Sequence, residues 1–432
     1  MDYEVLSSML PLGRPGKMVL GLETTRDLMD VLGNPQDKVP TIHVAGTNGK
    51  GSTAMYMATV LKEAGYKVGL YTSPSLHEFN DRIQINGVSI TDDQIYDFAK
   101  EIREYVLDTD LYFTEFELYT ALAWLHFARE SVDVCIIETG IGGRLDATNI
   151  IQSPILSVIT KISYDHQDVL GDTLPEIAGE KAGIIKEGSP VVYYPQEDEV
   201  DDVIINKAKE MGSTYATADL NALDYTLTDG RTQDFTYKNE EYTISLMETH
   251  QIYNAIVAIE AINVINAGEE FHIPQNALHD GLLQARWPGR FEWVSENPDI
   301  IIDGSHNLDG LTNLGDNIER YFSDRPRIAV VGMLGDKHHN EALPGTIQKF
   351  DAAVTVQPDS ERALTSDEMA EWIKKNNLLP ANKVYSEGKN YAQALTKAIE
   401  LTEKFGNDAM ICVFGSFYYI GDMREIIKKK FQ

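Results

Sequence analysis

The stretch Val39-Pro-Thr-Ile-His-Val-Ala-Gly-Thr-Asn-Gly-Lys-Gly-Ser52 is an apolar run that ends in a glycine-rich turn carrying one lysine. The run predicts a buried strand, and the pattern after it predicts a helix. Glycines in such a turn let backbone N–H groups point toward a bound anion, and the first turn of the helix adds its positive end. Lys50 supplies a point charge. We therefore predict a phosphate-binding loop made by Gly46, Thr47, Asn48, Gly49, Lys50, Gly51 and Ser52.

The loop departs from the common phosphate-loop pattern G-x-x-x-x-G-K-[ST]. Position 44 is Val44 where the pattern has glycine, and Gly51 separates Lys50 from Ser52. The alternative is an ordinary strand-to-helix turn with a surface lysine. The predicted strand before the loop and the predicted helix after it are the context that a phosphate site requires, so they favour the phosphate interpretation.

Length and charge limit the classes of protein to which the chain can belong. At 432 residues it is longer than one hydrophobic core usually supports, which predicts two domains, with a third as the alternative. Its 67 acidic and 37 basic residues give a formal net charge of −30. Nucleic acids and anionic membranes are bound by clustered Lys and Arg, so we expect neither as a partner. An anionic substrate must instead find local positive groups.

The sequence shows no pattern typical of export or membrane insertion. The N-terminus Met1-Asp-Tyr-Glu-Val lacks a basic segment followed by an apolar one, and no run of about 18 apolar residues occurs. Cys135 and Cys412 lie in apolar, strand-like runs, so we interpret them as core residues and not as a disulfide or metal pair. These features predict a cytoplasmic protein.

Apolar runs alternate with amphipathic segments along most of the chain. This alternation predicts an α/β fold built on parallel sheets. We expect an N-terminal domain like that of phosphate-loop ATPases, with a small antiparallel sheet appended to it, and a C-terminal Rossmann-like domain. In the first domain we predict strands at 41–45, 67–71, 134–138, 155–160 and 190–194, helices at 52–64, 91–105, 113–129 and 174–185, and antiparallel strands at 225–228, 233–238 and 241–246.

A second series of strands follows in the last third of the chain. The stretch Trp293-Val-Ser-Glu-Asn-Pro298 before this series is the best linker candidate, because Asn-Pro favours a turn. We accordingly predict one domain over residues 1–296 and another over residues 297–432. The strands of the second domain are predicted at 300–303, 328–332, 352–356, 383–385 and 410–414.

Ligands of open parallel sheets bind beyond the carboxyl ends of the strands. Polar residues follow several predicted strands, namely Ser73, Glu138, Asp165 with His166, and Asp303. Glu138 opens a glycine-rich run, and a carboxylate in this place is the usual arrangement for holding Mg²⁺ against a bound triphosphate. A dinucleotide site is the alternative, but Gly140-x-Gly142-Gly143 lacks the G-x-G-x-x-G spacing.

Four further features have two interpretations each, and a fifth, Lys181, has one from its spacing alone. His166 fits a structural histidine or a metal ligand, and the phosphate loop and carboxylate elsewhere in the chain favour the ligand. Lys181 lies on a segment whose spacing alone predicts an amphipathic helix with one charged face. Arg290 fits a phosphate contact or a surface ion pair, and Asn254 fits a nucleotide contact or a helix cap. Asp303-Gly-Ser-His-Asn307 fits a ligand-binding turn or an ordinary one.

Taken together, the motifs resemble the folylpolyglutamate synthase and dihydrofolate synthase family of the ATP-dependent Mur ligases, nearly end to end. This implies an ATP-binding domain followed by a ligase domain. The family's usual Asp-Gly-Ala-His-Asn is Asp-Gly-Ser-His-Asn here, a change between small residues. The resemblance rests on His43-Val-Ala-Gly-Thr-Asn-Gly-Lys-Gly-Ser52, Tyr71-Thr-Ser-Pro-Ser75, Phe79-Asn-Asp-Arg-Ile83, Glu138-Thr-Gly-Ile-Gly-Gly-Arg-Leu-Asp146, Asp165-His166, Gly179-Glu-Lys-Ala-Gly-Ile-Ile-Lys186, Trp287-Pro-Gly-Arg-Phe-Glu292, Asp303-Gly-Ser-His-Asn307 and Gly415-Ser-Phe-Tyr418.

By this resemblance the chain is a ligase that uses ATP to activate a folate carboxylate as an acyl phosphate, which the amine of glutamate attacks. The loop around Lys50 would hold the ATP phosphates, with further ATP contacts from Asn254, Arg290, Asp303 and His306. Two Mg²⁺ ions are implied, coordinated by Ser73, Glu138 and His166. Lys181 matches a lysine that is carbamylated in the family. The expected catalytic residues are therefore Lys50, Lys181, Arg290 and His306.

The resemblance also implies substrate contacts. Asp146 and Ser416 are candidates for the amino-acid side, and Phe79 and Arg82 belong to a segment, Pro74–Gly87, that resembles the loop near the pterin site. The family suggests a monomer. Whether the acceptor is dihydropteroate, an existing folate or both stays open, as does the length of the polyglutamate product.

Two alternatives remain. A Mur-type ligase of cell-wall synthesis usually carries a separate N-terminal domain, whereas only 45 residues precede Gly46, which is too short for a typical domain. A phosphate-loop ATPase or kinase without ligase activity would turn over ATP with no need of an amino acid. Glutamate-dependent phosphate release separates the ligase from this second alternative.

Overall fold

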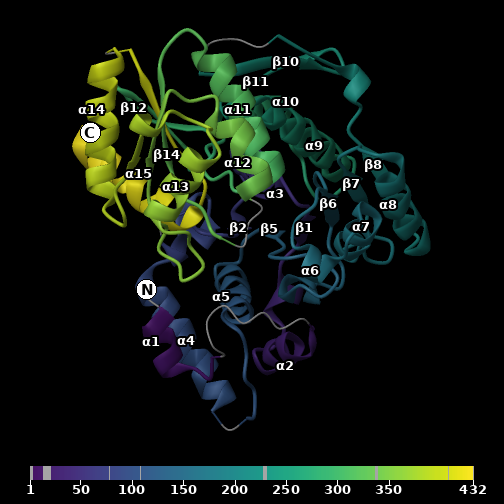
Figure 1. Cartoon of the computed structure of the whole chain (residues 1–432). Coiled ribbons are helices and arrows are strands. Elements are labelled where there is room, and N and C mark those ends of the chain that lie inside the picture. The colour runs from purple at the N-terminus through teal and green to yellow at the C-terminus, as the bar shows by residue number, and fades with distance from the viewer. Residues whose placement is uncertain are drawn as a thin grey trace. The chain divides into compact units, whose positions relative to one another are not determined.

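A computed structural model describes residues 3–12, 21–76, 78–107, 109–226, 231–335, 339–406 and 408–431 (Figure 1). The chain forms two compact units. The first unit contains the described residues of 1–226, 234–245 and 251–285, and the second contains those of 227–233, 246–250 and 286–432. No helix in these described ranges has the length and apolar character needed to cross a membrane.

The first unit is built on a sheet that has eight strands over the described residues, in the order β4-β3-β2-β5-β1-β6-β7-β8. The pairs from β2 to β8 are parallel, while β3 and β4 are antiparallel additions at one edge. Every residue of β1 is buried, as expected for a central parallel strand covered on both faces. The strands are β1 (Thr41–Ala45), β2 (Val68–Tyr71), β3 (Ile83–Ile85), β4 (Val88–Ser89), β5 (Val134–Glu138), β6 (Leu156–Ile159), β7 (Val191–Tyr193) and β8 (Tyr215–Thr217).

Three helices of the first unit begin at clear sequence signals. Thr91, Thr114 and Thr173 cap them, each paired with a Glu or Gln three residues later that returns a hydrogen bond. Trp124 on α5 is fully buried in the core. The helices are α1 (Tyr3–Met9), α2 (Glu23–Val31), α3 (Lys50–Glu63), α4 (Asp92–Val106), α5 (Glu115–Arg129), α6 (Gln167–Leu170), α7 (Leu174–Ala182), α8 (Asp198–Glu210), most of α9 (Thr249–Asn266) and α10 (Gln275–Gln284).

A small sheet follows β8 in the chain, as predicted. Its strands are β9 (Leu223–Tyr225), β10 (Gln233–Tyr237) and β11 (Glu240–Ile244), and β9 pairs with β10 in antiparallel fashion. The strand that was predicted at 225–228 corresponds to β9, which begins at Leu223. Positions 227–228 lie outside the described residues. Helix α10 packs on α3 so closely that a Cβ on Gly281 would lie 2.4 Å from the Cα of Val60.

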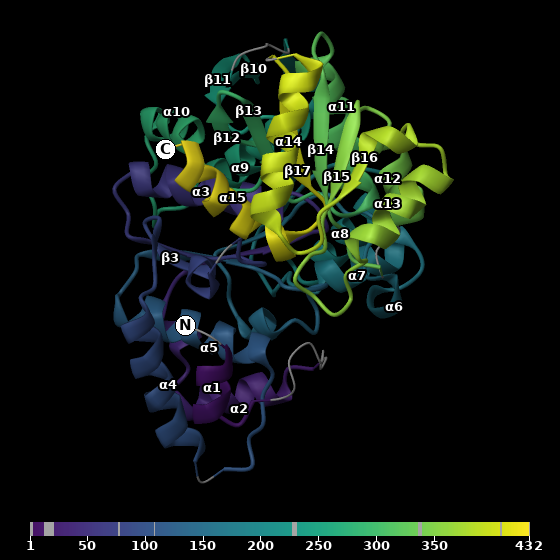
Figure 2. The ribbon, with the colours of Figure 1, turned by 60° about the vertical axis from the view of Figure 1, so that its left-hand side comes forward.

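The second unit has a sheet of six strands over the described residues, in the order β12-β13-β17-β14-β15-β16 (Figure 2). All its pairs are parallel except that of the edge strand β12 with β13. The core on one face joins the sheet to α11, α12 and α13, while α14 and α15 contact the strands as a second layer. The elements are β12 (Glu292–Glu296), β13 (Asp299–Asp303), β14 (Arg327–Val331), β15 (Ala352–Thr355), β16 (Val384–Ser386), β17 (Met410–Phe414), α11 (Leu308–Phe322), α12 (His339–Ile347), α13 (Ser366–Lys375), α14 (Tyr391–Phe405) and α15 (Phe417–Phe431).

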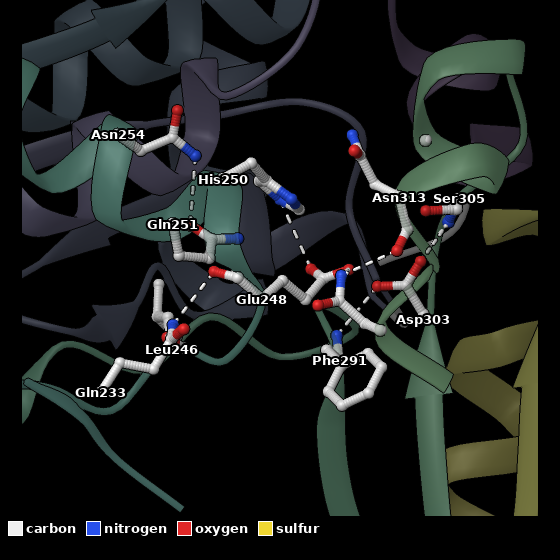
Figure 3. Close-up of polar contacts among 12 residues, drawn as sticks. Gln233, Leu246, Glu248, His250, Gln251, Asn254, Phe291, Asp303, Ser305 and Asn313 are labelled. Carbon is white, nitrogen blue, oxygen red and sulfur yellow. Dashed lines mark hydrogen bonds and ion pairs between the residues drawn. The ribbon is translucent and has the colours of Figure 1, made fainter. Parts of the chain in front are cut away.

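The short segment Leu246–His250, which leads into the first two residues of α9, also belongs to the second unit. Met247 belongs to its hydrophobic core, and the buried carboxylate of Glu248 accepts a hydrogen bond from Asn317 at 3.4 Å. Figure 3 also shows the ion pair between Glu248 Oε2 and His250 Nε2, 3.4 Å apart. Gln233 donates to the backbone oxygens of Leu246 and Glu248 at 2.7 and 3.0 Å. The second unit is therefore discontinuous in sequence.

The predicted fold class is confirmed, since both units carry the expected parallel sheets. The interpretation of Trp293–Pro298 as a linker is wrong, because residues Glu292–Glu296 form β12. This strand pairs with β13, Val294 is buried, and Arg424 makes a two-pronged ion pair with Glu292. Such tertiary contacts override the local turn signal of Asn-Pro, which here occupies only the two residues between the strands. The domain boundary at 296/297 stays a prediction.

Candidate active site

The phosphate loop runs from the end of β1 to the start of α3. Gly49 is the N-cap of α3 and has a φ of +87°, a left-handed conformation that favours glycine. A Cβ on Gly46 would lie 1.9 Å from Thr160 Oγ1, so this position also needs glycine. The N–H groups of Thr47 and Asn48 donate to the carbonyl of Lys161 at 2.8 and 3.1 Å. The loop is thus fixed by contacts with neighbouring residues of the protein.

Lys50 is the first residue of α3 and turns back toward the loop. Its Nζ donates to Thr47 O at 3.3 Å and lies 3.7 Å from Glu138 Oε1. The other oxygen of Glu138 accepts a hydrogen bond from the Ser73 backbone N–H at 3.2 Å. The structure therefore brings together a lysine, a buried carboxylate and Ser73, which the sequence placed at the ends of three different strands.

The donor set around Glu138 fits Mg²⁺ bound with a triphosphate. Such Mg²⁺ sites use one or two protein carboxylates and take the remaining ligands from phosphate oxygens and water. Glu138 is 3 % exposed and ends β5, and the backbone N–H of Ser73 holds one of its oxygens. Within the described ranges no group of three or more His, Cys, Asp or Glu side chains is arranged to hold a metal on its own. A metal here would therefore depend on the nucleotide for ligands.

His166 lies at the start of α6 in a left-handed conformation with a φ of +51°. Its Nε2 is 4.0 Å from Asp165 Oδ1, and its side chain is partly exposed. A non-glycine residue in this conformation is uncommon and is found more often at functional sites. The role of His166 as a metal ligand stays a prediction.

Lys181 is buried against the phosphate loop. Its side chain is 3 % exposed, and its Nζ donates to the carbonyl of Gly46 at 2.7 Å. Burial, together with the nearby charge of Lys50, lowers the pKa of Lys181 from its ordinary 10.5 to about 7, against the opposite effect of Asp165 and Asp146. Lys181 therefore lies on the packed side of α7 and not on an exposed face. The helical spacing was correct, but this face of α7 packs inward.

The lowered pKa of Lys181 predicts a pH dependence of stability. Between about pH 7 and 10.5 the unfolded chain binds a proton at this lysine that the folded chain does not. The free energy of unfolding should therefore rise with pH across this window, by up to about 1.4 kcal/mol per pH unit from this group. Urea unfolding in CO₂-free buffer at several pH values measures it. Lys181→Met should flatten that rise, and an unchanged slope would contradict the assignment.

Asp146 is a buried carboxylate that braces the loop after β5. Its Oδ1 accepts from the backbone N–H and hydroxyl of Thr148 at 3.0 and 2.6 Å, and its Oδ2 accepts from Ile141 N at 2.8 Å. Burial raises the pKa of Asp146, and these hydrogen bonds oppose the rise. Its contacts thus support the Glu138 loop, and its predicted contact with substrate stays a prediction.

Asn254 lies against the phosphate loop. A Cβ on Gly49 would come within 2.3 Å of Asn254 Oδ1, and the amide of Asn254 donates to Gln251 at 3.1 Å (Figure 3). Asn254 is the sixth residue of α9, so the helix-cap interpretation is wrong. Its position beside the N-cap of α3 is compatible with the predicted nucleotide contact.

The second unit carries its own group of predicted site residues at the end of β13. Asp303 is 1 % exposed, and its two oxygens accept hydrogen bonds from the backbone N–H groups of Phe291 and Ser305, both at 2.8 Å (Figure 3). His306 Nδ1 lies 3.0 Å from the carbonyl of Gly304. Asp303 therefore fixes the turn that presents His306, so this turn is more tightly braced than an ordinary Asp-Gly turn.

Arg290, His306 and Ser416 lie near one aromatic ring in the second unit. The guanidinium carbon of Arg290 is 4.9 Å from the centroid of the Phe417 ring, and the His306 ring is 6.0 Å from it. Ser416, just before Phe417, is 3 % exposed. The described contact of the Arg290 guanidinium is with this ring, and its predicted phosphate contact stays a prediction. No pattern in the sequence predicted that the Phe417 ring contacts both Arg290 and His306.

Phe79 and Arg82 meet a residue that sequence reasoning missed. The Phe79 ring is 4.0 Å from the Tyr119 ring, and the Arg82 guanidinium carbon is 5.4 Å from the same ring. Arg82 Nε is buried without a hydrogen-bond partner. Tyr119 lies on α5, far along the chain, and only the fold brings it to this segment. An aromatic surface beside a cation suits a planar acceptor that carries a carboxylate.

Two family models match the chain. The Mur ligase middle domain matches residues 44–262, which include the phosphate loop, Glu138 and Lys181. The glutamate ligase domain of Mur ligases matches residues 289–417, which include Arg290, His306 and Phe417.

The chain is similar to curated proteins over nearly its whole length. It is 37% identical over 421 residues to the dihydrofolate synthase/folylpolyglutamate synthase of Bacillus subtilis, covering 94% of this chain and 95% of that protein. Among solved structures, the folylpolyglutamate synthase of Mycobacterium tuberculosis complexed with ADP and AMPPCP is 29% identical, with a TM-score of 0.86 and coverage of 95% of this chain and 96% of that one. Escherichia coli FolC in complex with DHPP and ADP is 29% identical, with a TM-score of 0.85 and coverage of 99% and 97%.

Proposed function

The chain belongs to the Mur ligase family, in its group of dihydrofolate synthases and folylpolyglutamate synthases, and from this premise we propose that it joins L-glutamate to a folate carboxylate with the use of ATP. The carboxylate oxygen attacks the γ-phosphorus of ATP, which releases ADP and forms an acyl phosphate. The glutamate amine then attacks the acyl carbon, phosphate leaves, and the amine loses a proton. The observation that supports this most is the loop in which Lys50, Glu138 and Lys181 converge on one glycine-rich turn.

The residues of the site oppose the main barrier to this reaction, which is the repulsion between two anions. Lys50 and the backbone N–H groups at the start of α3 would bind the phosphates and neutralise charge as the phosphoryl group moves. By the family resemblance we propose Arg290 and His306 as further contacts to ATP. Mg²⁺ held by Glu138 and Ser73 would screen the phosphate oxygens. Two ions, with His166 as a ligand, are part of this proposal.

We propose further that Lys181 is carbamylated. A neutral amine reacts with CO₂, and the lowered pKa of Lys181 keeps much of this amine neutral near pH 7. A bond forms between Nζ and the carbon of CO₂, and a proton is released to solvent, which leaves an anionic carbamate. The nearby Lys50 charge would then stabilise this group, whereas it opposes protonation of the free amine.

For the acceptor, we assign the planar ring system to the surface made by Phe79, Arg82 and Tyr119. Asp146 and Ser416 are the proposed contacts on the side of the incoming glutamate. By the same family resemblance we propose a cytoplasmic monomer.

Phosphate release with Mg²⁺-ATP tests the function. We expect release to depend on glutamate and on an acceptor, either dihydropteroate or a reduced monoglutamyl folate, with mass spectrometry confirming the addition of glutamate. Turnover with both acceptors would make the enzyme bifunctional, and turnover with one would assign the branch. Release without glutamate would indicate an ATPase, and turnover only with a UDP-linked acceptor would indicate a cell-wall ligase.

A further inference from the structure

The side chain of Phe417 lies between two residues of the second unit that are proposed to meet ATP. The Arg290 guanidinium carbon stands 4.9 Å from the ring centroid, within the range of a cation–π interaction. The His306 ring centre is 6.0 Å away with an interplanar angle of 73°, an edge-to-face arrangement. One ring therefore contacts both side chains.

The ring of Phe417 is itself held in place by its surroundings. A Cβ on Gly304 would lie 2.2 Å from the Phe417 Cζ and 2.6 Å from both Cε atoms, so the ring occupies the space that a side chain at position 304 would need. Gly304 follows the braced Asp303, and its carbonyl lies 3.0 Å from His306 Nδ1. Phe417 begins α15 only three residues after the end of β17, which limits the movement of its backbone.

An aromatic face suits Arg290 better than a carboxylate would. A carboxylate would neutralise the guanidinium and accept its N–H donors, in competition with a phosphate. A ring attracts the cation through its quadrupole and leaves the edge of the guanidinium, with its N–H groups, available to a ligand. Within the described part of the chain, Arg290 has this ring and no carboxylate beside it.

We propose that Phe417 is a positioning residue, which holds Arg290 and His306 in the orientation that contacts the phosphates during acyl-phosphate formation. This inference rests on the proposed function. It adds a role for the ring that follows Ser416, and it explains why position 304 is glycine.

The test compares Phe417→Leu with Phe417→Tyr in the full-length chain. The leucine variant keeps apolar volume and removes the ring face, whereas the tyrosine variant keeps the ring. We expect kcat for glutamate-dependent phosphate release to fall roughly tenfold in Phe417→Leu, the size expected from loss of a cation–π contact, and to stay within about twofold in Phe417→Tyr. Phe350→Leu is the matched control, because Phe350 stacks on Phe414 in the core of the same unit. This control should lower the unfolding temperature and leave kcat near that of the wild type.

A double-mutant cycle with Arg290→Ala identifies the residue through which the ring acts. If Phe417 works mainly through Arg290, Phe417→Leu should cost little further activity in the Arg290→Ala background. Effects that are fully additive with both Arg290→Ala and His306→Ala, an unchanged kcat in Phe417→Leu, or an equal loss in Phe350→Leu would each overturn the inference.

Binding of Mg²⁺-AMPPCP, measured by calorimetry, separates this inference from the proposed function. Absence of glutamate-dependent turnover in the wild type would reject the proposed function. The binding comparison would still test the ring, since we expect affinity to fall severalfold in Phe417→Leu and to be kept in Phe417→Tyr. Equal affinities in all three proteins would overturn the positioning role.

Discussion

Lys50→Met is expected to lower kcat for glutamate-dependent phosphate release by roughly a hundred- to a thousandfold, the usual loss when one preorganised electrostatic contact to the transition state is removed. The Lys50 ammonium lies beside both the loop carbonyl of Thr47 and the Glu138 carboxylate, so it is held where a phosphate would bind. Methionine keeps the length and apolar character of the side chain. Stopped-flow or coupled phosphate release at saturating ATP measures the effect.

Lys62→Met is the matched control for this prediction. Lys62 lies in the last turn of the same helix and is exposed, so its removal changes the net charge by the same amount without reaching the loop. We expect its kcat to stay within about twofold of the wild type. A loss of activity in Lys62→Met, or retention of more than a tenth of the activity in Lys50→Met, would argue against the phosphate-binding role of Lys50.

Lys181→Met is expected to lower kcat by about a hundredfold and to abolish a dependence on bicarbonate. Wild-type protein kept in CO₂-free buffer should lose activity and regain it when bicarbonate is added. The recovery should be faster at pH 8 than at pH 6, because the Lys181 amine, with a pKa of about 7, is mostly neutral only above that value. NMR of protein equilibrated with ¹³C-labelled bicarbonate should show a carbamate resonance that Lys181→Met lacks.

Lys186→Met serves as the control for the bicarbonate experiment. Burial lowers the pKa of Lys186 as well, to about 8, but its Nζ is 3.4 Å from the carbonyl of Asn149 and not beside the phosphate loop. The response to bicarbonate should persist in this variant. If it vanishes there and remains in Lys181→Met, the modified lysine is the wrong one.

The strand, glycine-rich turn and helix around Lys50 and the parallel sheets were predictable because their signals are local. A buried strand, a glycine-rich turn and a helix follow one another within 25 residues, and each depends on its own short pattern. The same holds for the polar residues that end β5 and β13. Topology alone then places them at the carboxyl edge of their sheets, with no knowledge of distant contacts.

The features that sequence reasoning missed depend on contacts between distant segments. Tyr119 contacts Phe79 and Arg82 across about 40 residues, and Phe417 contacts Arg290 across more than 120. The contact of Lys181 with Gly46 could not be predicted for the same reason, since helical spacing tells which residues share a face but not what that face contacts. Strand β12 shows the same limit, because its own sequence favours a turn. Pairing with β13 and the ion pair between Glu292 and Arg424 stabilise it as a strand.

The short segment before α9 has a consequence for how this chain can be divided or exchanged. Because Met247 and Glu248 belong to the second unit while lying some 40 residues ahead of its main body, a gene cut near codon 286 would deprive that body of a core side chain and of the partner of Asn317. Recombination at a single crossover point would therefore transfer a second unit that lacks Met247 and Glu248. Inheritance of the two units as a pair, and not as exchangeable modules, follows from the path of the chain itself.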